Sequence, residues 1–313
     1  MIDIIALSND KKYYIKNVTD DINLSSDMST LGAELTLKTM DKKFTEGDIL
    51  ILKSDKKEIF RGIIIDSNSD GIPSPNNVST YSYNAFDFAF YLNKNQVFYK
   101  FKKKSASSCI KKLLSDFKIP IGKIADISYQ ISKIYNGNTV SDVIKDILEQ
   151  VKEKTGKKYY FEMVQGKFNL ININSLSAQY EVNSKTIISG PSHKRSIQNL
   201  KNSIVITDNS EKGKILHTVK SNSSISKYGK LQLVQSVDDK EKKRKKTIAN
   251  NLLKENNKVE DKLNFDVIGS FNLIPARIIK VNLKNIKGNY RITSTKHTIT
   301  SNLHVTSLEL ERI

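Results

Sequence analysis

Short runs in which apolar and polar residues alternate, found at both ends of the chain, constrain its fold most strongly. Near the N-terminus such runs occupy residues 33–37 and 59–65, and near the C-terminus they occupy 289–300 and 304–310. A period of two places successive side chains on opposite faces of a strand, so that one face is buried. The pattern predicts antiparallel sheet at both ends of the chain.

Between these ends the apolar spacing becomes that of helices. Residues 106–117 and 140–151 each repeat apolar side chains three and four positions apart, which is one face of an α-helix. Ser105 is a predicted N-cap for the first helix, and Thr139 with Asp142 forms a capping-box pattern for the second. A pair of short strands follows, so two amphipathic helices are expected to pack against a hairpin.

The expected fold class is mainly β with an α/β insert, in which two antiparallel β-barrels flank a helix-containing middle domain. At 313 residues the chain is too long for one ordinary core. The predicted domains are a first β-barrel at 1–101, the α/β insert at 102–190, and a second β-barrel at 191–313. The last domain is expected to carry a charged helix at about 239–258.

An internal echo connects the two predicted barrels. GDILILKSDKKEIFRGIII (47–65) and PARIIKVNLKNIKGNYRITST (275–295) each contain a strand, a lysine-containing turn and a second strand. Phe60-Arg61 and Tyr290-Arg291 occupy comparable places in the two segments. Similar hairpins arise easily in unrelated sequences, but similar flanking strands at both ends of the chain suggest that the two barrels are related.

A net charge of +18 raises the question of nucleic-acid binding. Only six of the 51 basic residues are arginine, the side chain suited to bidentate phosphate and base contacts. A surface of solvated lysines, some of them facing acidic partners, is the simpler interpretation. Non-specific nucleic-acid binding stays an alternative.

The chain is expected to be made in the bacterial cytoplasm. Asp3 interrupts the first apolar run and the positive charges follow it, which is not the order of a signal peptide. No run approaches the roughly 18 apolar residues of a membrane span. The single cysteine, Cys109, cannot form an intrachain disulfide and lies on the apolar stripe of the first helix, where an inert core thiol is expected.

Residues suited to catalysis or metal binding are sparse. The common phosphate-binding, dinucleotide-binding, serine-hydrolase and zinc-protease motifs are absent from the sequence. His297 and His304 meet only if the chain turns at 301–302, and hydrogen-bonded strand histidines are expected there in preference to a metal site. Asp87, within YNAFDFAFYL, is the one acid in an apolar setting, which favours a raised pKa. Because glycan hydrolysis needs a second carboxylate, Asp87 is expected to cap or hydrogen-bond a turn. No catalytic residue, metal ligand or cofactor is predicted.

The segment DKEKKRKK opens the predicted charged helix. Its basic residues are Lys240, Lys242, Lys243, Arg244, Lys245 and Lys246. A nearly all-charged stretch does not pack in a core, so it is either solvated or docked on an acidic surface. These six residues are the predicted basic patch, which would line a central channel or contact an acidic neighbouring ring.

Several segments resemble the PBSX-prophage type of baseplate hub protein, within the wider late-control-protein family. The most specific are SIQNLKNSIVIT, SISKYGKLQLVQSVDD and GNYRITSTKHTITSNLHVTSLELERI. The N-terminal half resembles the family by layout, with LGAELTLKT, the Gly-Asp hairpin at 47–65 and NTVSDVIKDILEQ. The family typically has a second Gly-Asp before its last strands, where this sequence has Pro275-Ala276.

The resemblance implies a non-enzymatic hub that is a homotrimer in a contractile phage tail or a phage-tail-like bacteriocin. Two tube-protein-like barrels in each chain would present a pseudo-sixfold surface to the hexameric tail tube protein. The other face would receive the central spike protein. Further implied partners are the tape-measure protein and LysM-type and wedge baseplate proteins, with DNA only passing through the lumen and no membrane or cofactor. A tail-tip peptidoglycan hydrolase is the alternative function.

Overall fold

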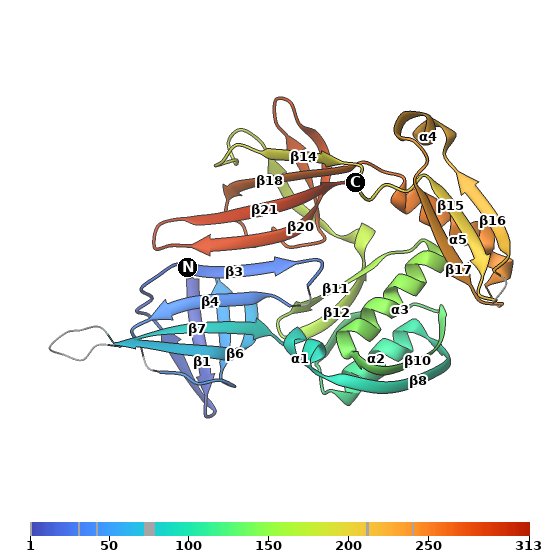
Figure 1. Ribbon diagram of the computed structural model, residues 1–313. Coiled ribbons are helices and arrows are strands. Elements are labelled where there is room, and N and C mark those ends of the chain that lie inside the picture. The colour runs from blue at the N-terminus through green and yellow to red at the C-terminus, as the bar shows by residue number, and fades with distance from the viewer. Residues whose placement is uncertain (1, 31, 42, 72–78, 211–212, 240) are drawn as a thin grey trace. The chain divides into compact units, whose positions relative to one another are not determined.

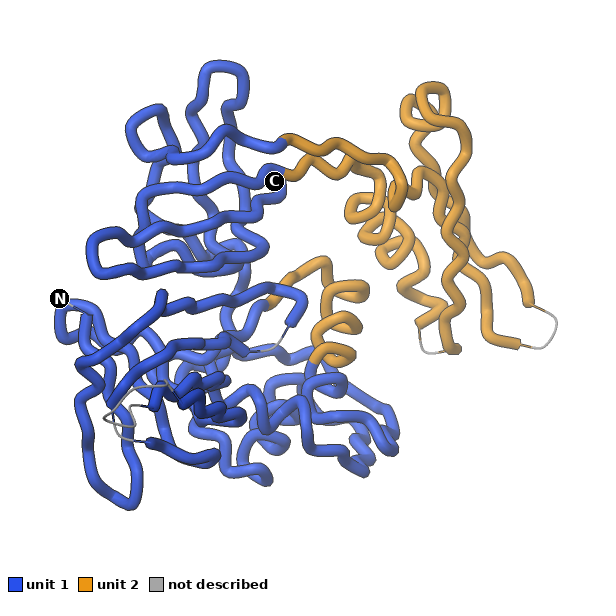
Figure 2. Tube along the Cα trace, turned by 60° about the vertical axis from the view of Figure 1, so that its left-hand side comes forward, with its two compact units in different colours: residues 1–144, 160–192, 263–313 blue, residues 145–159, 193–262 orange. Residues whose placement is uncertain are grey.

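The computed structural model describes residues 2–30, 32–41, 43–71, 79–210, 213–239 and 241–313 (Figure 1). The chain divides into two compact units (Figure 2). Unit 1 contains residues 1–144, 160–192 and 263–313, and unit 2 contains residues 145–159 and 193–262. Both units are assembled from separate stretches of the chain. The three-domain division at residues 101 and 190 stays a prediction.

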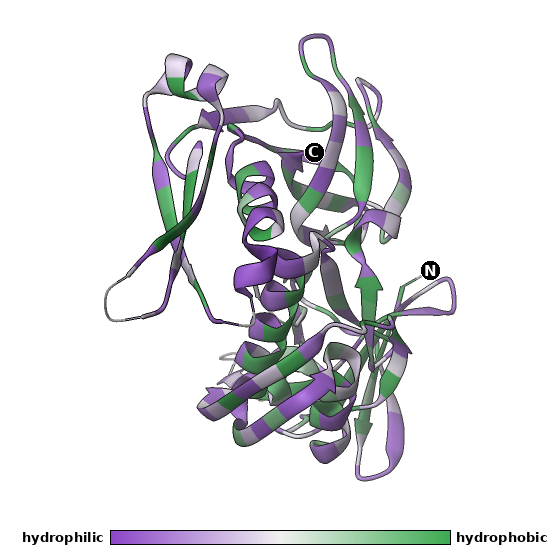
Figure 3. Cartoon of the chain, turned by 90° about the vertical axis from the view of Figure 1, so that its right-hand side faces the viewer, coloured by the Kyte–Doolittle hydropathy of each residue, from purple (hydrophilic) through white to green (hydrophobic). Residues whose placement is uncertain are grey.

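The N-terminal strands of unit 1 form a group that we term the first module. They are β1 (Ile2–Ser8), β2 (Lys11–Ile15), β3 (Ile22–Asp27), β4 (Glu34–Thr39), β5 (Ile49–Ser54), β6 (Lys57–Gly71) and β7 (Ser79–Asp87). Their order in the sheet is β3-β4-β7-β6-β5-β1-β2. Hydrophobic and hydrophilic residues alternate along these strands (Figure 3), so that apolar side chains share one face. Leu35, Leu50 and Tyr83 are among the residues that pack in this core.

A second group of strands, the second module, repeats this arrangement. It comprises β13 (Ser177–Val182), β14 (Ser192–Ser196), β18 (Glu260–Ile268), β19 (Ile278–Asn282), β20 (Lys287–Ile299) and β21 (His304–Arg312). The order β14-β18-β21-β20-β19-β13 matches the order β3-β4-β7-β6-β5-β1 in the sheet and along the chain. The last pair differs in direction, because β13 pairs parallel with β19 and β1 pairs antiparallel with β5. Residues 193–196 of β14 and 260–262 of β18 belong to unit 2. The second module has its own core, which includes Leu263, Tyr290 and Leu310.

The two modules join into one sheet. β3 pairs antiparallel with residues 294–299 of β20, so that the described strands form a 13-stranded sheet that begins at β2 and ends at β14. The mainly-β class is confirmed, but the sheet is open and the two closed barrels are not confirmed. Alternation specifies which face of a strand is buried, and it leaves open which strand edges meet.

The repeat extends to individual backbone hydrogen bonds. In the first module the Gly47 amide donates to the Ile64 carbonyl oxygen at 3.0 Å, and in the second the Ala276 amide donates to the Ile292 carbonyl oxygen at 2.8 Å. Gly47 has a φ of +96° and Ala276 a φ of +70°. Ala276-Arg277 therefore occupies the place of Gly47-Asp48 in the turn, one residue beyond the Pro275-Ala276 match, and Ile64 is the counterpart of Ile292.

Phe60-Arg61 and Tyr290-Arg291 are not counterparts, as the sequence suggested, because this alignment shifts them by two residues relative to each other. The counterpart of Tyr290 is Gly62, and the counterpart of Phe60 is Gly288. A Cβ atom on Gly62 would lie 2.4 Å from the ring of Phe60, and one on Gly288 would lie 3.7 Å from the ring of Tyr290. Each module thus places one buried aromatic ring beside a glycine two positions away on the same strand, with the two positions exchanged.

The insert between the modules contains the predicted helices. Its elements are α1 (Ala89–Lys94), β8 (Gln96–Ser105), α2 (Ala106–Asp116), β9 (Ile121–Ile124), β10 (Gln130–Thr139), α3 (Val140–Thr155), β11 (Tyr159–Val164), β12 (Lys167–Asn172) and η1 (Ile173–Ser175). The predicted caps are confirmed: the Ser108 amide donates to Ser105 Oγ at 3.3 Å, and the Asp142 amide donates to Thr139 Oγ1 at 3.1 Å. Cys109 is buried, and burial raises the pKa of its thiol to about 11, as expected of an inert core thiol.

Unit 2 contains a small sheet covered by a helix. Its main elements are β15 (Ser203–Asp208), β16 (Ile215–Lys220), α4 (Asn222–Tyr228), β17 (Gln232–Val237), η2 (Lys242–Arg244) and α5 (Lys245–Asn256). α5 buries Ile248 and Leu252 in a core with Ile204 of β15. The helix predicted at 239–258 is shorter than expected: α5 begins at Lys245 and ends at Asn256, and the 3-10 turn η2 precedes it. Among the described residues, no helix is long and apolar enough to cross a bilayer.

Candidate functional site

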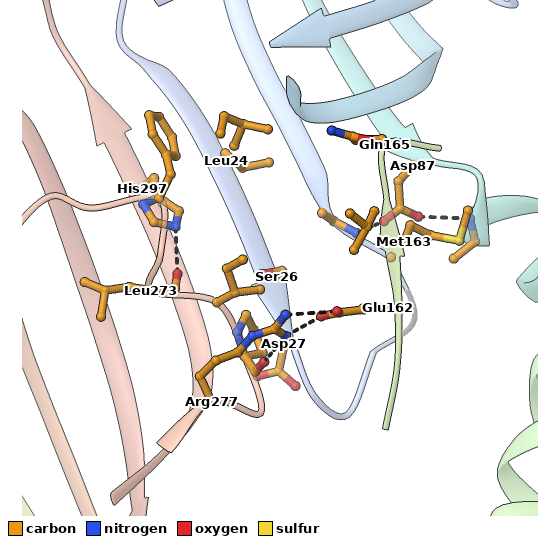
Figure 4. A pocket seen from close by; sticks show the side chains of 18 of the residues that line it. Leu24, Ser26, Asp27, Asp87, Glu162, Met163, Gln165, Leu273, Arg277 and His297 are labelled. Carbon is orange, nitrogen blue, oxygen red and sulfur yellow. Dashed lines mark hydrogen bonds and ion pairs between the residues drawn. The ribbon is translucent and has the colours of Figure 1, made fainter. Parts of the chain in front are cut away.

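A cavity of about 260 Å³ in unit 1 gathers charged, aromatic and apolar side chains (Figure 4). It is lined by residues of β3, β6, β11 and β20, the end of β7, the segment 271–277, and Thr30, Gly32 and Ala33. Four carboxylates reach it, namely Asp27, Glu58, Asp87 and Glu162. An enclosed group of acids is where a catalytic pair or a ligand site is first sought.

Asp87 is the most deeply buried of these acids. Its Oδ2 accepts a hydrogen bond from the Ala33 amide at 2.8 Å, and its Oδ1 accepts one from the Ala89 amide at 2.9 Å. Burial raises the pKa of the carboxyl group to about 6, although both amides favour the charged form. Asp87 therefore fastens the segment before β4 to the start of α1, and the prediction that it hydrogen-bonds a turn is confirmed.

The other three carboxylates also have partners. Glu162 of β11 accepts from both terminal nitrogens of Arg277, with 2.9 Å between Nη2 and Oε1. Glu58 forms a bidentate pair with Arg61, at 2.9 and 2.7 Å. Asp27 accepts from the amide and the hydroxyl of Ser29. Asp87 and Glu162 thus connect distant chain segments, whereas Glu58 and Asp27 bond within their own segments.

The sequence did not single out the Glu162–Arg277 pair. The two residues lie 115 positions apart, and their side chains are 9% and 13% exposed. A charged residue on an alternating strand gives no signal that its partner is distant. The turn at Pro275-Ala276 places the Arg277 side chain beside Glu162 of β11.

His297 and His304 are brought together, because β20 and β21 form a hairpin. His297 Nδ1 lies 3.1 Å from His304 Nε2, and His297 Nε2 lies 3.1 Å from the Leu273 carbonyl oxygen, to which it donates. Burial lowers the pKa of His297 to about 4, so the ring is neutral at pH 7. The prediction of hydrogen-bonded strand histidines is confirmed. Within the described ranges, no group of three or more His, Cys, Asp or Glu is placed to hold a metal ion.

The predicted basic patch lies on unit 2, just before and within the first turn of α5. Lys240 lies outside the described residues. Lys242 Nζ is 2.7 Å from Asp239 Oδ1 and 3.7 Å from Asp208 Oδ2, so this lysine is already paired. The remaining members are exposed or half-buried, and they are Lys243, Arg244, Lys245 and Lys246. Their role in docking stays a prediction.

Comparison with solved structures places the fold among phage tail proteins. The tail protein from Neisseria meningitidis MC58 superposes with a TM-score of 0.74 and 14% identity, over 99% of this chain and 96% of that one. The family model described as YQBQ-like matches residues 22–311. The chain therefore belongs to the YqbQ-like family, which confirms the resemblance to the PBSX-prophage type.

Two curated relatives come from Bacillus subtilis strain 168. The uncharacterized protein YqbQ is 29% identical over 248 residues, which cover 76% of this chain and 73% of that protein. The phage-like element PBSX protein XkdQ is 29% identical over 215 residues, which cover 67% of this chain and 64% of that protein. The similarity to each relative thus extends over most of the chain.

Proposed function

We propose that the chain is a structural hub in the baseplate of a contractile phage tail or a phage-tail-like particle, where it joins a hexameric tail tube to a trimeric central spike. The observation that carries the proposal is the repeated strand order of the two modules. Three copies of a chain with two similar modules supply six similar surfaces around one axis. A trimer can therefore match a sixfold tube on one face and a threefold spike on the other.

The family and the fold support a role in a phage tail. One relative is a protein of the phage-like element PBSX, and the tail protein from Neisseria meningitidis has the same fold. The engagement of all four cavity carboxylates supports a role without catalysis. In this role the chain is made in the bacterial cytoplasm and released in the baseplate. Its partners there are the tail tube, spike, tape-measure, LysM-type and wedge proteins.

The copy number of the chain in assembled particles tests this function. Tail particles purified from an induced producer strain are analysed by quantitative mass spectrometry, with the tail tube protein as internal reference. We expect about three copies per particle, as for a single ring at a threefold position. A protein that stays in the soluble lysate and is absent from the particles would overturn the proposal and move a tail-tip hydrolase to the front.

The basic patch has its own test within this proposal. Its exposed members are changed to glutamate in one variant, Lys243→Glu, Arg244→Glu and Lys246→Glu, which leaves the paired Lys242 untouched. A patch that docks on an acidic ring is expected to block particle assembly after charge reversal, while the purified chain keeps its circular dichroism spectrum. The matched control reverses Lys11, Lys12 and Lys16 near β2. Normal assembly of the patch variant would assign these residues to a solvated surface.

A further inference from the structure

The antiparallel pairing of β3 with β20, which we term the joint, links the two modules within one chain (Figure 1). Ile22–Asp27 pairs antiparallel with residues 294–299, which are the six residues after the bulge in β20. Because Ile64 is the counterpart of Ile292, the counterparts of these six residues are 66–71 of β6. They too follow a bulge and pair with the next strand, β7. The counterpart of β3 is β14. The chain therefore contains one complete joint, between β3 and β20, and the two unpaired strands of a second, namely β14 and residues 66–71 of β6.

Both halves of the second joint are open strand edges. In the described part of the chain, β14 has only β18 as a strand neighbour, and residues 66–71 have only β7. Five of these six β6 residues are exposed, whereas burial alternates along residues 294–299, where β3 covers the edge. An exposed edge with unpaired N–H and C=O groups is a template for pairing with another chain.

The two edges carry opposite charges. The β6 segment 66–71 contains Asp66 and Asp70, and β14 contains His193, Lys194 and Arg195 in a row. Asp70 is paired with the half-buried Lys38, and both His193 and Arg195 contact Asp261 of the neighbouring strand β18. An acidic edge and a basic edge attract each other, and each repels a second copy of itself, so the charges favour pairing between the unlike edges.

We propose that β14 of one copy pairs with residues 66–71 of β6 in a second copy of this chain, repeating between copies the joint that β3 and β20 make within one. The two edges are different surfaces, so the contact is heterologous and either closes into a ring or continues as a filament. The inference rests on the proposed hub function, in which the ring closes at three copies.

Engineered cysteines test the pairing directly, since the one native cysteine, Cys109, is buried. The variant Asn68→Cys with Lys194→Cys places one thiol near the centre of each edge. The matched control, Asn68→Cys with Lys12→Cys, moves the second thiol to β2, the edge at the other end of the sheet. Both variants are treated with a short bismaleimide, as concentrated full-length protein and within purified tail particles. Denaturing gels then give the size of the linked species.

The outcomes separate this interface from the hub function. We expect linked dimers and trimers from the Asn68–Lys194 variant, none above trimer, and monomer from the control. A ladder that continues past trimer would keep the interface and overturn threefold closure. A particle that holds three copies without this cross-link would keep the hub and overturn the interface. A chain that is monomeric in the concentrated protein and present as one copy in the particles would overturn both the interface and the hub function.

A charge exchange provides a second measurement. Lys194→Glu faces Asp66 or Asp70 across the proposed joint, and we expect it to lower the cross-linking yield of otherwise matched cysteine variants about tenfold. The cysteine pair for this measurement is Ser69→Cys with Ser192→Cys, which leaves Lys194 available. Adding Asp66→Lys to Lys194→Glu is expected to restore the yield. An unchanged yield in Lys194→Glu would overturn the role of the charges in selecting the unlike edges.

Discussion

The first and second modules have the same strand order but differ in what their turns and edges contact. At one matched turn, Asp48 follows Gly47 and accepts a hydrogen bond from the Thr45 amide at 2.9 Å, within its own loop. At the other, Arg277 follows Ala276 and pairs with Glu162, 115 positions away. One turn is held locally, and the other is held by an element of the insert.

This difference indicates which parts of the repeat are shared and which are specialised. Strand order, the bulge in the long strand and the turn hydrogen bonds are common to both modules. The side chains that leave the sheet are different, because each module faces different neighbours. Backbone geometry therefore specifies the repeat, and the outward side chains specify what each copy of the repeat can bind.

Truncation of the matched core residues tests the shared part most strongly. Ile64 and Ile292 are 1% and 0% exposed, and each lies in the core of its own module. We expect Ile64→Ala and Ile292→Ala each to lower the free energy of unfolding by about 4 kcal/mol, because each leaves a cavity. Urea unfolding followed by circular dichroism measures the loss. Losses that differ by more than about 2 kcal/mol would mean that the two cores are not packed alike.

Removal of the matched turn side chains is expected to lower stability by different amounts in the two modules. Arg277→Ala leaves Glu162 without its partner in a mostly buried site, so we expect a loss of about 3 kcal/mol. Asp48→Ala removes one local hydrogen bond and should cost about 1 kcal/mol. Thermal unfolding of the two variants side by side gives the ranking. The reverse ranking would contradict the claim that the second turn is anchored by the insert.

The dependence of stability on pH should differ in sign between the modules. His297 titrates near 4 when folded and near 6.5 when unfolded, so acidification from pH 6 to pH 4 protonates mainly the unfolded chain and lowers stability. Asp87 titrates near 6 when folded and near 3.8 when unfolded, so the same acidification protonates mainly the folded chain and raises stability. Each slope is at most about 1.4 kcal/mol per pH unit.

Variants resolve the two opposing slopes. Asp87→Asn is expected to lose stability on acidification more steeply than the unchanged chain, because the opposing contribution of Asp87 is removed. His297→Gln is expected to lose stability less steeply, for the converse reason. The midpoint of urea unfolding at several pH values gives each slope, and the slopes are compared in place of the absolute stabilities. Identical slopes in all three proteins would show that neither group dominates this range.

The sequence predicted the local features of the fold well, because they depend on neighbouring residues. Ser105 and Thr139 cap their helices as expected, and Asp87 hydrogen-bonds its turn. The pairing of β3 with β20 and the Glu162–Arg277 pair depend on residues far apart in the chain, for which alternation gives no signal. The aromatic-arginine match was misleading by two residues, because Phe60 and Tyr290 exchange places with their glycines.

The smallest predicted effects come from the residue with positive φ in each matched turn. A Cβ on Gly47 meets nothing within 4 Å, so Gly47→Ala is expected to cost about 1 kcal/mol from backbone conformation alone. Ala276 already bears this conformational cost, but its methyl group is buried with Ile173 and Leu176. Ala276→Gly relieves the backbone and loses that packing, so we expect a gain of at most about 0.5 kcal/mol. Differential scanning calorimetry of both variants measures the pair. A clear loss in Ala276→Gly would show that packing against the insert outweighs the backbone cost, which is the same dependence on the insert that distinguishes Arg277 from Asp48.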